Sequence, residues 1–137
     1  MKKQVLAVAL LALCGAANAG WTPIATVKDP SASPKSIPVS VSVDLEHLKK
    51  DHDKVFLWSL EEYSEGQASG LRSTIALEQY DCTMRVSGVI QMRQYAEPTG
   101  KGVVLGEKIF KNGTVKFMPV ARDGPQAQLF NMLCHPN

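Results

Sequence analysis

Apolar and polar residues alternate along several short stretches of this chain, which is the pattern of strands with one buried face. Over residues 39–43, valines alternate with serines, and β-branched residues at a period of two indicate a half-buried strand. Residues 21–27 and 103–110 have a similar character, and residues 71–95 form the longest β-type region. We therefore expect a domain built mainly from β-strands.

Residues 55–58 (VFLW) break the alternation, because all four are apolar. A strand with two apolar faces is central in its sheet and covered on each face. We therefore expect another element to pack over the sheet at this strand.

Local patterns predict the connections between strands. Residues 45–50 are polar and tolerate a helix, so we expect one helical turn there, capped by Asp44. Gly88 interrupts a β-type region and favours a bulge or bend. The Asn-Gly pair at 112–113 is typical of a type I′ turn, which predicts a hairpin that pairs residues 115–120 with the preceding strand.

The end of the chain has the spacing of a helix. Asp123 stands where a cap belongs, and Pro125 suits the first helical turn. Ala127, Phe130 and Cys134 follow at i, i+3 and i+7, which places them on one apolar stripe. This helix is the element expected to cover the sheet.

The beginning of the chain has the three parts of a secretory signal. Two lysines precede an apolar run over residues 5–13, and Ala17 and Ala19 give the small-x-small pattern that a signal peptidase accepts. The run is too short to span a bilayer as a helix, which needs about 20 residues. We expect a signal peptide over 1–19, cleavage after Ala19, and a single domain over 20–137 with no transmembrane segment.

Lipid anchoring at Cys14 is an alternative to free secretion. A lipoprotein signal places Gly, Ala or Ser before the cysteine, whereas Leu13 precedes Cys14 here. We therefore favour an exported protein of the periplasm or cell surface that is cleaved after Ala19.

Cys82 and Cys134 are the cysteines left after the signal is removed. A pair of cysteines in an exported chain indicates a disulfide bond, which is worth roughly 4 kcal/mol for a loop of about 50 residues. Because Cys134 lies on the apolar stripe of the helix and Cys82 on a strand, this bond would hold the helix against the sheet.

The charge of the mature chain excludes one class of function. Removal of the signal takes two of the 15 basic side chains and leaves 13, equal to the 13 acidic ones. A nucleic-acid-binding protein needs a basic excess to replace phosphate counterions, so we do not expect one.

Motifs for catalysis or for a cofactor are weak. There is no G-x-S-x-G nucleophile motif, and we predict neither enzymatic activity nor a cofactor. His47, Asp51, His52 and Asp53 form the one plausible metal cluster, but histidines five apart do not share a helix face, so we predict no metal site.

Lys49, Lys50 and Lys54 flank the same acidic residues. They are either a solvated turn between strands or a docking patch for an extracellular or envelope protein, and all three amino groups should reach solvent.

The order of these features resembles the surface-adhesin protein E family of Gram-negative bacteria, over nearly all of residues 21–134. The resemblance rests on Trp21 at the start of the mature chain, VFLW at 55–58, YDC at 80–82, the glycine-containing hairpin and the Pro-led helix that ends in LFNMLC at 129–134.

The resemblance implies an α+β fold, with an antiparallel sheet of about six strands and a C-terminal helix held on its concave face by the disulfide. It also implies non-enzymatic binding of host proteins such as vitronectin, laminin and plasminogen. A periplasmic inhibitor of lysozyme, which inserts the loop at 64–70 or at 97–102 into a cleft, is the leading alternative. An envelope accessory protein is another alternative, and a homodimer is compatible with each of these functions.

Overall fold

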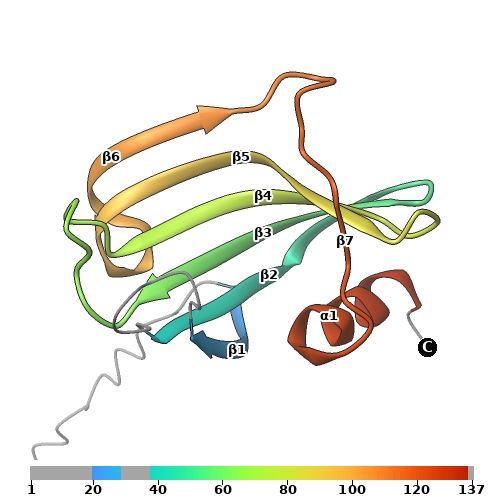
Figure 1. Cartoon of the computed structure of the whole chain (residues 1–137), viewed down its shortest axis with the longest axis horizontal. Coiled ribbons are helices and arrows are strands. Elements are labelled where there is room, and N and C mark those ends of the chain that lie inside the picture. The colour runs from blue at the N-terminus through green and yellow to red at the C-terminus, as the bar shows by residue number, and fades with distance from the viewer. Residues whose placement is uncertain (1–19, 29–37, 136–137) are drawn as a thin grey trace, which may run out of the picture.

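The computed structural model describes residues 20–28 and 38–135, so the predicted signal peptide, including Cys14 and the cleavage position at Ala19, lies outside the described residues. Six strands lie side by side in chain order, each antiparallel to its neighbours, and a seventh short strand pairs with β5 (Figure 1). The expected α+β fold is confirmed. The elements are β1 (Trp21–Lys28), β2 (Pro38–Asp51), β3 (Lys54–Tyr63), β4 (Ser73–Asp81), β5 (Val86–Glu97), the short 3₁₀ helix η1 (Pro98–Gly100), β6 (Lys101–Ile109), β7 (Met118–Pro119) and α1 (Gly124–Cys134).

The expected C-terminal helix packs its apolar stripe on one face of the sheet. α1 follows Asp123, with Pro125 in its first turn, and the disulfide between Cys82 and Cys134 is confirmed. Cys82 lies in the turn directly after β4 rather than on a strand. The buried core consists of Val43, Val55, Leu57 and Tyr80 from the sheet, Val120 from the segment before the helix, and Leu129, Phe130 and Leu133 from α1.

This helix is too short to cross a membrane. Within the described residues, no helix is both long enough and apolar enough to do so.

Strand β3 is central, as expected, but a helix covers only one of its faces. Val55 and Leu57 are buried beneath α1, with 2% and 0% of their surface exposed. Phe56 and Trp58 point to the opposite face and are half-buried. The expectation that this strand is covered on both faces is therefore wrong for residues 56 and 58, because no second α-helix lies on that face in the described part of the chain.

The expected helical turn over residues 45–50 is replaced by a bulge in β2. Asp44 pairs with Trp58 and Lys49 with Phe56, so four residues of β2 face a single residue of β3. Asp44 Oδ1 accepts the backbone N–H groups of Glu46 and of the following residue, both at 3.1 Å, as a helix cap would. The strand nevertheless resumes pairing at Lys49, and the bulged segment places its two leucines against the core.

The Asn-Gly turn at 112–113 forms without the expected hairpin. Residues 115–117 instead cross over β5, and Met118 and Pro119 pair with Ser87 and Val86. Gly88 permits this crossing, because a Cβ there would lie 2.9 Å from Val115 Cγ1. The bulge expected near Gly88 is found two residues later, at Ile90, which the register of β4 and β5 skips.

Candidate functional site

The face of the sheet opposite α1, which we call the open face, has no α-helix of the described residues over it, and the short η1 packs on it at Ile75. The strand register aligns one residue from each of the six long strands in a single row across this face. Directly paired residues share a face of an antiparallel sheet, so their side chains are neighbours. From β1 to β6 the row is Trp21, Asp44, Trp58, Leu77, Gln91 and Ile109.

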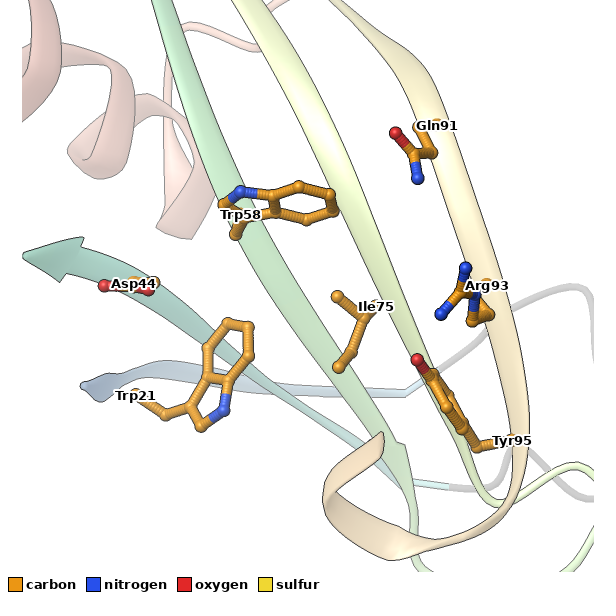
Figure 2. Close-up of a pocket in the computed structure, with 7 residues that line it drawn as sticks. All are labelled: Trp21, Asp44, Trp58, Ile75, Gln91, Arg93 and Tyr95. Atoms are coloured by element: carbon orange, nitrogen blue, oxygen red, sulfur yellow. The ribbon is translucent and has the colours of Figure 1, made fainter. Parts of the chain in front are cut away.

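A hollow of about 280 Å³ lies along this row, and we call it the open-face groove. Its aromatic lining consists of Trp21, Trp58 and Tyr95, and its polar lining of Asp44, Gln91 and Arg93. Ile75 lies between the two tryptophans and the Arg93–Tyr95 side, as Figure 2 shows. The groove therefore combines flat apolar surfaces with both hydrogen-bond donors and acceptors.

Asp44 is held in place on the floor of the groove. Its Oδ2 lies 2.7 Å from His47 Nδ1, and its side chain is 15% exposed. Burial alone would raise the pKa of Asp44, but the hydrogen bonds and charge of His47 and the N–H of Glu46 outweigh it, so the pKa lies below its usual value. Asp44 is therefore an ionised acceptor at neutral pH.

Arg93 carries the positive charge of the groove and is already paired. Its Nη2 donates to Glu107 Oε2 at 3.0 Å, and both side chains are about two-fifths exposed, at 42% and 39%. Glu107 and Tyr95 both raise the pKa of Arg93. The guanidinium is thus oriented by a partner on β6.

A second hollow, of about 520 Å³, adjoins the open-face groove through their shared residue Trp58. Phe56, Leu77, Lys49 and Lys50 contribute to its lining. The two hollows together run along the open face toward the turn between β2 and β3.

The structure places the three predicted lysines around this turn. Lys49 and Lys50 lie within β2, opposite Phe56 and Val55, and Lys54 begins β3, opposite Asp51. All three are exposed. Neighbouring residues of a strand alternate between faces, so Lys49 and Lys54 share the open face. Lys50 is directed to the other face by its pairing with Val55 but also contributes to the lining of the second hollow.

The histidines and aspartates near the same turn form separate pairs. His47 contacts Asp44, and His52 Nδ1 lies 2.7 Å from Asp51 Oδ1, with both of the latter side chains largely exposed. Across the described residues, no three His, Cys, Asp or Glu side chains converge as metal ligands would.

One of the two loops considered for insertion into a cleft is folded against the sheet. In the loop at 97–102, Ser73 Oγ donates to the carbonyl of Glu97 at 2.6 Å and accepts the N–H of Gly100 at 3.0 Å. This holds the loop over Ile75, so closely that a Cβ on Gly100 would overlap it. The loop at 64–70 is mostly exposed.

The covered face contains a buried polar network beneath the start of α1. Glu78 accepts hydrogen bonds from Ser59 Oγ at 2.7 Å and from Tyr80 Oη at 2.8 Å. Burial, followed by the charge and hydrogen bond of Glu78, raises the pKa of Tyr80 well above its usual value.

Sequence reasoning missed the open-face groove. The available signal was in residues 55–58, where the aromatic residues at 56 and 58 alternate with the aliphatic residues at 55 and 57. A strand with one aromatic and one aliphatic face indicates that its two faces lie in different environments. Trp21, Tyr95 and Arg93 join that face through the register of distant strands, which no local pattern specifies.

Comparison with known proteins assigns this architecture to a family. The sequence model described as surface-adhesin protein E matches residues 21–135. No curated protein matches the chain closely enough to be compared.

Solved structures of Haemophilus influenzae protein E share the fold. Its crystal form II is 14% identical, with a TM-score of 0.54 over 69% of this chain and 79% of that one. Its selenomethionine form is also 14% identical, with a TM-score of 0.55 over 70% and 79%. Protein E from a non-typeable strain is 12% identical, with a TM-score of 0.53 over 85% and 76%.

Proposed function

Because this chain belongs to the surface-adhesin protein E family, which matches it over residues 21–135, we propose that it is a non-enzymatic adhesin that binds a host extracellular protein. The family match over the whole described domain is the observation that carries this proposal. The resemblance drawn from the sequence pointed to the same family.

The chemistry of the open face supports binding of a macromolecule. Phe56, Trp58 and Leu77 give it apolar surface that is only half-buried, and Lys49 and Lys50 add positive charge at one end. Aromatic residues supply much of the binding energy of protein interfaces, and clustered charge accelerates encounter.

Export with removal of residues 1–19 is part of this proposal. Gly20 lies beside two carboxylates, since a methyl group on its Cα would lie 3.2 Å from Asp44 Oδ1 and 3.6 Å from Glu46 Oε2. Cleavage after Ala19 would create a positively charged amino group on Gly20, within reach of both. This surrounding suits a mature N-terminus.

Solid-phase binding of the exported protein to vitronectin, laminin, plasminogen and lysozyme tests the function. We expect saturable binding to at least one of the first three. Protease treatment of intact cells provides the matched test of location, because an adhesin is digested and a periplasmic protein is protected. If the protein is protected from the protease and also inhibits lysozyme, its function is that of a periplasmic inhibitor and not that of an adhesin.

A further inference from the structure

We propose that the open-face groove is a binding site for a neutral saccharide, in which a pyranose ring packs between Trp21 and Trp58. This proposal goes beyond the protein-binding function proposed above, because the ligand is a sugar and not a polypeptide, although both functions would use Trp58. Three features of the groove lead to this inference.

The first feature is the arrangement of the two tryptophans. Trp21 on β1 and Trp58 on β3 both pair with Asp44 on the strand between them, so their backbones are two strand spacings apart, about 9.5 Å. A sugar ring has apolar C–H faces and a polar rim. Each indole ring offers a flat apolar surface to such a face, and Figure 2 shows both side chains at the same hollow.

The second feature is the mixture of polar groups around these rings. Asp44 is an acceptor, the amide of Gln91 both donates and accepts, and the hydroxyl of Tyr95 does the same. Sugar hydroxyls also donate and accept at once, so they require such a mixture. A purely apolar partner would leave the amide of Gln91 without hydrogen-bond partners when water is displaced.

The third feature is the balance of charge, which favours a neutral ligand. Asp44 already contacts His47 at 2.7 Å, and Arg93 already pairs with Glu107 at 3.0 Å. A phosphate, a carboxylate or a quaternary ammonium group would have to compete with these partners. An uncharged hydroxyl can form a hydrogen bond to Asp44 or Arg93 while the Asp44–His47 and Arg93–Glu107 pairs stay intact.

The size of the groove fits one or two sugar units. Its volume of about 280 Å³ lies just below the roughly 300–1,000 Å³ of small-molecule sites. Beyond Trp58 the second hollow, of about 520 Å³, continues along the open face and leaves room for a longer chain.

Tryptophan fluorescence provides a direct test, because the two tryptophans of the chain both line the groove. The exported protein is titrated with lactose, cellobiose, chitobiose and N-acetyllactosamine, and separately with sialyllactose and choline chloride. We expect a saturable emission change with at least one of the four neutral sugars. A saturable response to choline or sialyllactose alone, or no response to any probe at tens of millimolar, would overturn the proposal.

Variants locate the response within the groove. With calorimetry as the readout, Trp21→Ala and Gln91→Ala should each weaken binding of the responding sugar by about tenfold or more. Ile109→Ala is the matched control, since Ile109 lies in the same row but is 64% exposed and outside the groove. Unchanged affinity in both Trp21→Ala and Gln91→Ala, with thermal unfolding like that of the parent, would also overturn it.

The same variants separate this site from the adhesin function. If Trp21→Ala loses the sugar but still binds the host protein, the two functions use different surfaces. If the parent protein binds no host protein, the adhesin proposal fails, and the sugar titration still tests the saccharide site by itself.

Discussion

Cys82 and Cys134 are joined by a disulfide although 52 residues separate them, and their Cα atoms lie 5.4 Å apart. Cys82 directly follows β4 and Cys134 ends α1, so the bond fixes the end of the helix to the sheet. Both cysteines also pack against the buried core.

Removal of this bond by Cys134→Ser should lower the free energy of unfolding by roughly 2–5 kcal/mol, because the unfolded chain is no longer constrained. Denaturant titration measures the loss. A Cys82→Ser/Cys134→Ser double variant is the control for the unpaired thiol. Two freely reactive thiols in the exported, unreduced protein would contradict the prediction.

Gly88→Ala should destabilise the fold by about 1–3 kcal/mol, because the new Cβ would lie 2.9 Å from Val115 Cγ1 and 3.0 Å from the carbonyl of Lys116. The segment that crosses β5 would have to shift. Thermal unfolding measures the effect. Gly66→Ala is the matched control, since its Cβ would lie 3.5 Å from Arg72 Cδ, an ordinary contact. Equal melting temperatures for the two variants would show that the crossing is not tightly packed.

Tyr80→Phe should cost about 1–3 kcal/mol at neutral pH, because it leaves Glu78 without one of its buried donors. It should also change how the free energy of unfolding depends on pH above pH 10. The pKa of Tyr80 is raised above its usual 10.0 by burial and by Glu78, so the folded protein holds this proton more tightly than the unfolded chain. The resulting stabilisation is complete below pH 10 and is lost as the pH rises above it.

Thermal unfolding between pH 7 and pH 11 measures this dependence. The parent should lose stability more steeply above pH 10 than Tyr80→Phe. Ser59→Ala removes the other hydrogen bond to Glu78 but no titrating group, so it should keep the parent's alkaline slope. Identical slopes for the parent and Tyr80→Phe would refute the assignment.

Replacement of Lys49, Lys50 and Lys54 by Ser should leave the melting temperature nearly unchanged, because exposed charges contribute only about 0–1 kcal/mol. The association rate with the host protein should fall, most clearly at low salt, since clustered charge steers encounter. Surface plasmon resonance at two salt concentrations measures the rate.

The control for charge alone is a second triple replacement at exposed lysines outside that turn, at Lys101, Lys111 and Lys116. It removes the same net charge and should slow association less. Equal rates for the parent and the first triple variant would identify the turn as a solvated connection between strands.

Cleavage after Ala19 should give a mature chain that begins at Gly20, which intact-mass measurement of the exported protein decides. Replacement of Ala17 and Ala19 by bulky residues should retain the full-length precursor, because the peptidase accepts small residues at both positions. A mature chain that begins at a lipidated Cys14 would show that the protein is a lipoprotein.

Patterns within single segments were enough to predict the strands and the helix. Alternating valines over 39–43 and the apolar stripe that ends at Cys134 depend on local periodicity, which a sequence displays directly. The two local predictions that are wrong, the helical turn at 45–50 and the hairpin at 112–113, have suitable capping or turn residues. Pairing with β3 prevailed at the first, and pairing with β5 prevailed at the second.

The groove could not be predicted in the same way. It depends on the register that aligns Trp21 with Trp58 and brings Arg93 beside them, and bulges at 45–48 and at Ile90 set that register. A bulge that differed by one residue would send the following side chains to the other face. Such irregularities arise from packing between strands and leave little trace in the sequence of either one.

The order of the strands determines when the disulfide can form during export. Each long strand pairs with the one that precedes it in the chain, so the sheet can assemble progressively as the chain crosses the membrane. α1 comes last, yet its core includes Ile24 from the first strand and the turn after β4. The native pairing of Cys82 with Cys134 is therefore a late event, because it joins the last element of the described residues to the turn after β4.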